Sequence, residues 1–260
     1  MKQYKYFHIT TLLLLLAAFS ACKKVIQVNL NSTSPLYVVQ GNVINQPGPY
    51  LVSITKTVNF DQDNVFPPVD GAIVVITDVT AGTTDTLKEL TSGNYYTTIT
   101  NGIPGHTYKL YINASGNIFT ATCTMPQPVT LDSLYTQAAL FGSHQDVVPV
   151  YTDPPALGNY YFFQMYRNDT LVNDIYIRND MLINGQVIKQ PLNGGDIISG
   201  DSVTLYLQCI DSSMYQYYYS LQQTENQNAA TPANPLSNIT GGALGYFSAN
   251  TLSGKEIVVP

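Results

Sequence analysis

The clearest indication of the fold is in residues 71–125, which read GAIVVITDVTAGTTDTLKELTSGNYYTTITNGIPGHTYKLYINASGNIFTATCTM. Short runs rich in β-branched and aromatic residues alternate there with residues that favour tight turns. The predicted strands are 71–79, 84–90, 93–100, 106–114 and 117–125. The predicted turns are Ala81-Gly82, Ser92-Gly93, Pro104-Gly105 and Gly116-Asn117. Strands spaced about 8–12 residues apart with such turns predict a β-sandwich.

Residues 71–79 are too apolar for an exposed strand, so we expect them to form a central strand of a sheet. The run from residue 71 to residue 116 resembles the Ig-like or prealbumin-like modules of exported bacterial proteins. That resemblance implies a scaffold and no particular activity.

The sequence predicts two domains after residue 21. Upstream strands are expected at 25–30, 36–44 and 50–58, and a turn rich in proline and glycine separates the last two. Residues 125–129, MPQPV, cannot form a paired strand because of their two prolines. We therefore expect an N-terminal Ig-like β-sandwich over 22–125 and a C-terminal β-rich domain over 126–260.

The second domain is predicted to consist of antiparallel strands. They are expected at 131–135, 160–168, 175–179 and 203–210, with 243–249 and 256–260 completing the second sheet. Residues 141–159 contain three prolines and predict a loose connection. Residues 181–201 hold four glycines and predict hairpins and loops.

One short helix is predicted near 212–224. Asp211 is a suitable N-cap, and apolar or aromatic residues recur after it at helical spacing. The triplet Tyr217-Tyr218-Tyr219 could act as a stacking platform for carbohydrate. Successive helical side chains point about 100° apart, however, so packing into the core is the favoured interpretation.

Cys123 and Cys209 each alternate with apolar residues along a predicted strand. We expect both thiols to be small core residues, buried in separate sheets and not joined by a disulfide bond.

Residues 1–21 predict a secretory signal peptide. Lys2 and Lys5 precede the apolar run 12–19, which is shorter than the roughly 20 residues of a membrane-spanning helix. The tetrad Phe19-Ser20-Ala21-Cys22 resembles a bacterial lipobox, and this resemblance implies that Cys22 becomes the lipidated N-terminus. Acyl chains there would attach the protein to a membrane. An ordinary secreted protein is the alternative.

The charge of the chain argues against nucleic acid as a partner. It has 11 Lys and Arg against 17 Asp and Glu, a net charge of −6, and no basic cluster follows Lys23-Lys24. The 20 tyrosines and few charged residues are typical of exported β-rich proteins.

No motif predicts catalysis. A nucleophile elbow and an HExxH pair are absent from the sequence. Three weaker patterns are incomplete and do not predict a site: a metal site from His144, Asp146 and Asp153, a calcium loop at 61–64, and a phosphate loop at Gly241, Gly242 and Gly245. We expect no catalytic residue, no cofactor and no metal site. A glycosidase carboxylate pair leaves no motif, so a hydrolase remains an open alternative.

Four segments together resemble one known family. They are the lipobox followed by Lys24-Val25-Ile26, the module from GAIVVITD to HTYKLYI, the joint PQPVTLDSL, and NPLSNITGGALGYFSA near the end. Over nearly all of the mature chain these resemble the Bacteroidota lipoprotein family catalogued as domain of unknown function 4249. The resemblance implies an envelope lipoprotein, often associated with TonB-dependent outer-membrane receptors, and it brings no catalytic residue.

These observations predict a membrane-anchored, non-catalytic binding or accessory protein that is associated with a TonB-dependent transporter. A structural or adhesive envelope protein is the alternative, and a hydrolase is a further one. We expect an outer-membrane lipoprotein. Lys23 and Lys24 stand where surface-directed lipoproteins of this phylum carry acidic residues, which favours the periplasmic face.

Overall fold

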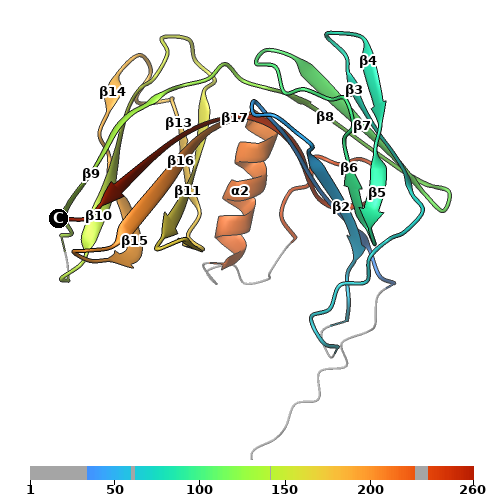
Figure 1. Cartoon of the computed structure of the whole chain (residues 1–260), viewed down its shortest axis with the longest axis horizontal. Coiled ribbons are helices and arrows are strands. Elements are labelled where there is room, and N and C mark those ends of the chain that lie inside the picture. Colours follow the sequence, from blue (N-terminus) through green and yellow to red (C-terminus); the bar gives the residue numbers. More distant parts are fainter. Residues whose placement is uncertain (1–33, 60–61, 141, 226–233) are drawn as a thin grey trace, which may run out of the picture. The chain divides into compact units, whose positions relative to one another are not determined.

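The computed structural model describes residues 34–59, 62–140, 142–225 and 234–260 (Figure 1). This part of the chain is mainly β, with several antiparallel sheets and a single α-helix, which confirms the predicted fold class. The predicted signal peptide over 1–21, the predicted lipidation site Cys22 and the strand expected at 25–30 lie outside the described residues. In the described part, no helix is both long enough and apolar enough to cross a membrane.

The first half forms two facing sheets around one core. Its strands are β1 (Tyr37–Ile44), β2 (Leu51–Lys56), β3 (Ile73–Asp78), β4 (Thr83–Thr86), β5 (Lys88–Thr91), β6 (Asn94–Tyr96), β7 (Thr107–Ala114) and β8 (Asn117–Thr124). One sheet has the order β4-β3-β7-β8, so β3 is an interior strand as predicted. The other contains β1-β2-β6-β5. The first core lies between them and includes Val39, Ile54, Ile76 and Leu110.

The strand predicted at 84–90 is wrong in one respect, because the chain changes sheets within it. β4 belongs to the β3 sheet and β5 to the β6 sheet, with the buried Leu87 between them. The strand predicted at 93–100 is also shorter than expected. It ends at Tyr96, and the backbone N–H groups of residues 98–100 bind the carboxylate of Asp85 instead.

The second half has its own core. Its elements are β9 (Leu131–Ala138), β10 (Gln145–Thr152), β11 (Tyr160–Arg167), β12 (Thr170–Leu171), β13 (Tyr176–Asn179), β14 (Val187–Ile188), β15 (Leu192–Ile197), β16 (Ser202–Ile210) and α2 (Ser212–Glu225). The second core includes Tyr161, Phe163, Leu205 and Leu207.

The loose connection predicted over 141–159 is wrong, because β10 lies within it. This strand pairs with β9 along one side and with β15 and β14 along the other. On the second side the ladder is interrupted between Val147 and Tyr151, so Pro149 stands where only β9 is a partner. A proline without an N–H is tolerated at such a position.

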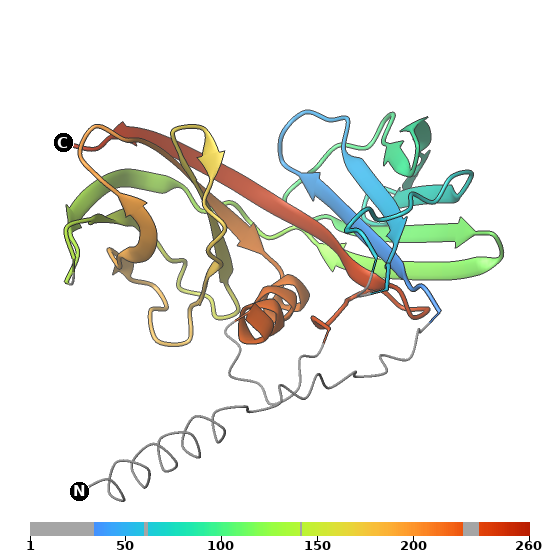
Figure 2. The same cartoon turned by 90° about the horizontal axis from the view of Figure 1, so that it is seen from below.

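The two strands predicted at 243–249 and 256–260 are one continuous strand, β17 (Leu244–Val258), of 15 residues. Its first half pairs in parallel with β1, and its second half pairs antiparallel with β16. Figure 2 shows this strand, in red, running between the two sets of strands. It joins them into a nine-stranded sheet with the main order β12-β11-β16-β17-β1-β2-β6-β5. The segment predicted at 256–260 does pair with β16 of the second half, whereas the segment predicted at 243–249 pairs with β1 of the first half.

The C-terminal segment consequently contributes to both cores. Phe247 and Ala249 are buried in the first core, whereas Val259 is buried in the second. The domain boundary at residues 125–126 stays a prediction.

The sequence NITGGALGYF has a structural explanation. Thr240 pairs with Thr120 of β8, and the side-chain amide of Asn238 bonds both the N–H and the C=O of Phe247, at 3.0 and 2.7 Å. The Asn238 side chain thus satisfies the backbone groups of Phe247 as a neighbouring strand would. Gly245 has a φ of +91°, and a Cβ there would lie 2.0 Å from the carbonyl oxygen of Val39.

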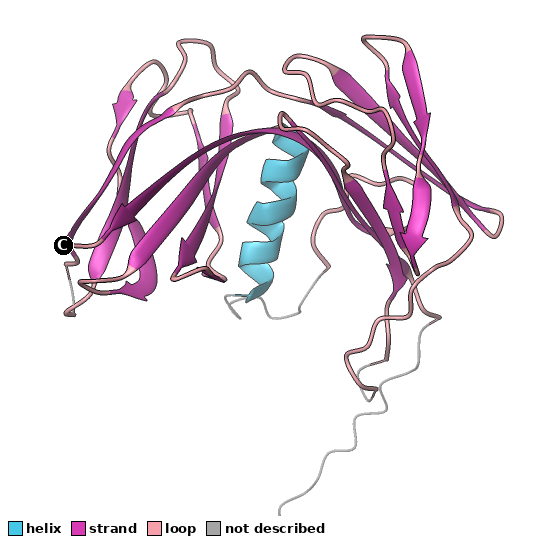
Figure 3. Ribbon diagram, in the orientation of Figure 1, coloured by secondary structure: helices cyan, strands magenta, loops and turns pink. Residues whose placement is uncertain are grey.

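Helix α2 begins where predicted. The carboxylate of Asp211 accepts a hydrogen bond of 2.9 Å from the backbone N–H of Met214, which is N-cap geometry. Figure 3 shows this helix in cyan among the strands. Its aromatic side chains pack against residues of β11 and β17.

We expect Asp211→Ala to lower the free energy of unfolding by about 1 kcal/mol, because the Met214 N–H loses its acceptor. Urea unfolding of the protein measures this. The exposed neighbour Ser212 provides the control, and Ser212→Ala should change stability by less than about 0.5 kcal/mol. Equal losses in the two variants would contradict the capping role.

Both remaining cysteines are buried and free, Cys123 in the first core and Cys209 in the second. The prediction that they are core residues of separate sheets is confirmed. Burial raises the pKa of each thiol, which keeps it in the neutral form.

Candidate functional site

The nine-stranded sheet carries a row of amides on the face that points away from the two cores. Alternate residues of a strand point to opposite faces, so the neighbours of the core residues on β1, β11, β16 and β17 share this face. The row consists of Gln40, Asn42, Gln164, Gln208 and Asn250, and we call the hollow it lines the amide groove. Its volume is about 450 Å³, which lies in the range of small-molecule sites.

Hydrogen bonds order the amides of β11, β16 and β17. Asn250 donates its Nδ2–H to Gln208 Oε1 at 3.0 Å, and Gln208 donates its Nε2–H to Gln164 Oε1 at 3.3 Å. The side chains that line the groove are all uncharged. The groove therefore offers hydrogen-bond donors and acceptors to a polar ligand and places no charged side chain beside it.

Aromatic residues of α2 form one end of this face. Tyr218 stacks on Phe162 with ring centroids 4.2 Å apart, and Tyr217 packs on Tyr246 at 5.0 Å. Burial raises the pKa of Tyr246, so its hydroxyl stays protonated at neutral pH. The prediction that the tyrosine triplet packs into the protein is confirmed for Tyr217 and Tyr218, whereas Tyr219 is 50% exposed.

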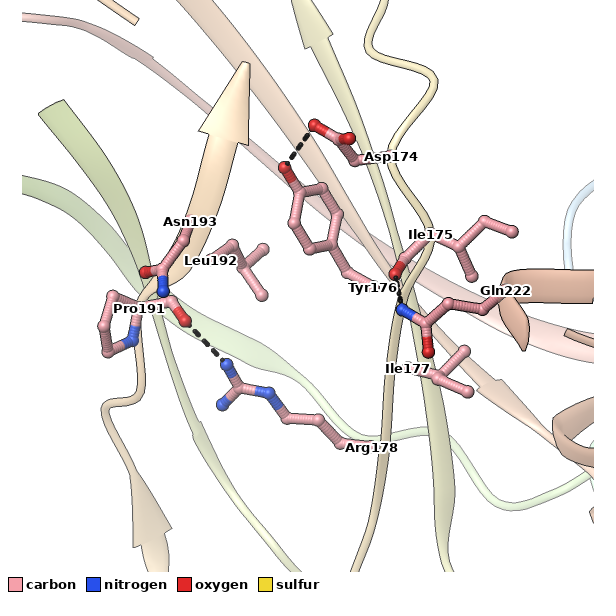
Figure 4. A pocket seen from close by; sticks show the side chains of 9 residues that line it. All are labelled: Asp174, Ile175, Tyr176, Ile177, Arg178, Pro191, Leu192, Asn193 and Gln222. Atoms are coloured by element: carbon pink, nitrogen blue, oxygen red, sulfur yellow. Dashed lines mark hydrogen bonds between the residues drawn. The ribbon is translucent and has the colours of Figure 1, made fainter. Parts of the chain in front are cut away.

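A second hollow lies beside β13, and we call it the arginine pocket (Figure 4). It has a volume of about 380 Å³. Strand β13 and the residues before it form one wall, residues 191–193 form another, and Gln222 of α2 closes the side. Figure 4 shows Asp174 at one end and Arg178 at the other, with the ring of Tyr176 between them.

Arg178 is held firmly but carries no ion pair. Its Nη2 donates to the carbonyl oxygens of Gln190 and Pro191, both at 3.0 Å, and its guanidinium lies 5.5 Å from the ring centre of Phe163. Among the described residues no carboxylate lies within salt-bridge distance of it. Burial lowers the pKa of Arg178, and the neighbouring Tyr151 hydroxyl offsets part of that effect.

One buried nitrogen of the guanidinium and one buried hydroxyl near it lack hydrogen-bond partners in the described part of the chain. Within the described residues, neither Arg178 Nη1 nor the Tyr151 hydroxyl has a hydrogen-bond partner. The two groups are close enough to influence each other's pKa. Unpaired buried polar atoms are costly, and a bound water or ion is one explanation for them.

The acidic end of the arginine pocket depends on a glycine. Tyr176 donates its hydroxyl to Asp174 at 3.1 Å, and burial raises the pKa of Tyr176. Gly194 has a φ of +128°, and a Cβ there would lie 2.6 Å from the Asp174 carboxylate and 2.8 Å from the Tyr176 hydroxyl. Only glycine leaves this space open.

The residues considered for a metal site from sequence do not converge. Asp153 binds the hydroxyl of Tyr161 and the N–H of Gly185, while Asp146 is buried on β10. Across the described ranges, no group of three or more His, Cys, Asp or Glu side chains could hold a metal ion. Part of the loop at 61–64 lies outside the described residues.

Sequence reasoning missed both hollows. Tyr176 and Arg178 alternate along the strand predicted at 175–179, and Asp174 directly before it continues the same period of two, which could have marked one face. The amide groove had no such signal, because its residues come from four separate strands.

These features define a class: a mainly β protein in which one sheet is shared by two cores and carries an open polar face. The chain belongs to the family described as Domain of unknown function (DUF4249), whose model matches residues 23–255. This confirms the family predicted from the sequence. A comparison with curated proteins finds no match.

Proposed function

We propose that this protein is a lipid-anchored, non-catalytic binding protein of the bacterial envelope that acts as an accessory to a TonB-dependent outer-membrane transporter. The observation that carries the binding role is the uncharged, hydrogen-bonding lining of the amide groove. General acid–base chemistry needs titratable groups at the reacting atoms, whereas recognition of a polar ligand needs donors and acceptors such as these. The lipobox resemblance supports the anchor, and the family resemblance supports the transporter.

The anchor is tested by Cys22→Ser. We expect the wild-type protein to fractionate with the outer membrane and Cys22→Ser to be released, because the acyl chains are its only proposed attachment. Membrane fractionation and mass spectrometry of the mature N-terminus measure this. Ser34→Ala, an exposed position, is the control and should remain membrane-bound. An unmodified N-terminus on a membrane-bound wild-type protein would contradict the proposal.

The transporter association is tested by gentle detergent extraction and affinity purification of the lipidated protein. We expect a TonB-dependent receptor to co-purify in near-equal amount. Absence of any receptor, together with protease accessibility at the cell surface, would favour a structural or adhesive role instead. Protease accessibility in intact cells also reports which membrane face the protein occupies.

A further inference from the structure

The arginine pocket has an excess positive charge at one end. Arg178 is fixed by two backbone carbonyls and by Phe163, yet no carboxylate among the described residues pairs with it. The other arginine of the described chain, Arg167, is ion-paired, since its Nε lies 2.7 Å from Asp201 Oδ2. A partly buried cation without a counter-charge attracts an anion more strongly than an exposed one does.

The opposite end has an excess negative charge. Asp174 is exposed, accepts a hydrogen bond from Tyr176, and within the described residues has no lysine or arginine in salt-bridge distance. The amides of Asn193 and Gln222 also line the pocket, and the Gln222 Nε2–H donates to the carbonyl oxygen of Ile175 at 2.9 Å. The remaining donors and acceptors of these amides can bond polar groups of a bound molecule.

We propose that the arginine pocket binds a short zwitterionic peptide, whose terminal carboxylate pairs with Arg178 and whose terminal ammonium pairs with Asp174. This site is separate from the amide groove and does not depend on the anchor or on the transporter. The uncapped peptide is selected because each end of the pocket provides the opposite charge.

The dimensions agree with a peptide of about three residues. Asp174 and Arg178 are four positions apart, which corresponds to at most about 13 Å between their Cα atoms at roughly 3.3 Å per residue. Three extended peptide residues span about 10 Å, and the two charged side chains cover the remaining distance. A volume of about 380 Å³ is sufficient for a ligand of this kind.

The experiment is a calorimetric titration of the mature protein with trialanine, with its C-terminal amide and with its N-acetyl form. We expect each capped peptide to bind about 10- to 100-fold more weakly than trialanine, the usual effect of one charge-assisted hydrogen bond. Arg178→Gln should remove the preference for the free carboxylate. Asp174→Asn should remove the preference for the free ammonium.

Asp174 is exposed, so we expect Asp174→Asn to fold. This variant tests the proposal even if Arg178→Gln proves unstable. Asp169→Asn, also exposed and on the adjacent hairpin, is the matched control and should bind all three peptides as the wild type does. The proposal is overturned if trialanine shows no saturable binding to the wild-type protein. It is equally overturned if either capped peptide binds as tightly as trialanine. Neither result bears on membrane attachment or receptor co-purification.

Discussion

Gly245→Ala is expected to destabilise the protein by about 3 kcal/mol or more, because it combines a strained backbone with a steric collision. Gly245 has a φ of +91°, and its Cβ would lie 2.0 Å from the carbonyl oxygen of Val39, its partner in the parallel pairing of β1 and β17. The carbonyl belongs to backbone, so it cannot move aside as a flexible side chain would. Urea unfolding measures the loss.

Gly116→Ala separates the two causes. Gly116 has a similar φ of +86°, but a Cβ there meets no atom within 4 Å. We expect it to cost only about 1 kcal/mol, the strain alone. Hydrogen exchange should also accelerate in β1 of Gly245→Ala and not in Gly116→Ala. Similar stability losses in both variants would show that the contact with Val39 is unimportant.

Asp85→Asn is expected to destabilise the protein at neutral pH by about 2–4 kcal/mol, since it weakens several charge-assisted hydrogen bonds at once. Asp85 is 3% exposed and accepts bonds of 2.7–2.9 Å from the backbone of residues 98–100 and from the hydroxyls of Thr98 and Thr100. This carboxylate holds the segment after β6 against β4. The exposed Asp63 provides the control, and Asp63→Asn should be nearly neutral.

The same carboxylate makes stability depend on pH. Burial alone would raise the pKa of Asp85, but hydrogen bonds from Ile99, Thr98 and Thr100 outweigh it and lower the pKa to about 2. A lowered pKa in the folded state stabilises the protein above the unfolded value of 3.8, and this contribution is lost as the pH falls towards 2. The expected loss is about 2 kcal/mol. Unfolding curves between pH 5 and pH 2 should show it for the wild type and not for Asp85→Asn.

Features that depend on neighbouring residues were predicted well from the sequence. The helix N-cap at Asp211, the buried positions of Cys123 and Cys209, and the interior strand β3 all follow from local spacing and polarity. In each case the signal lies within one segment: a capping residue type before a helical spacing, an alternation of apolar residues, or a continuous apolar run.

Features that depend on strand pairing were predicted poorly. Pro149 suggested a loop, but the strand around it has a partner on only one side at that position. The change of sheet at Leu87 had no marker beyond a continuous strand-like pattern. Register and partner choice depend on residues far away in the chain, and no local rule specifies them.

The two hollows show the same division. Arg178, Tyr176 and Asp174 share one face of one segment, so their alternation is visible in the sequence. That Arg178 and Asp174 have no ion-pair partner among the described residues is visible only in the structure. Gln40, Gln164, Gln208 and Asn250 meet only because β17 pairs with β1 on one side and with β16 on the other.

Local patterns were thus sufficient for the mainly β class, the helix and the family, because backbone propensity and side-chain periodicity act over a few residues. The continuous strand β17 and the polar face across it arise from pairing between the two ends of the chain. That pairing is selected by the burial of Phe247 and Ala249 in the first core and of Val259 in the second, a free-energy gain that exists only once both cores have formed.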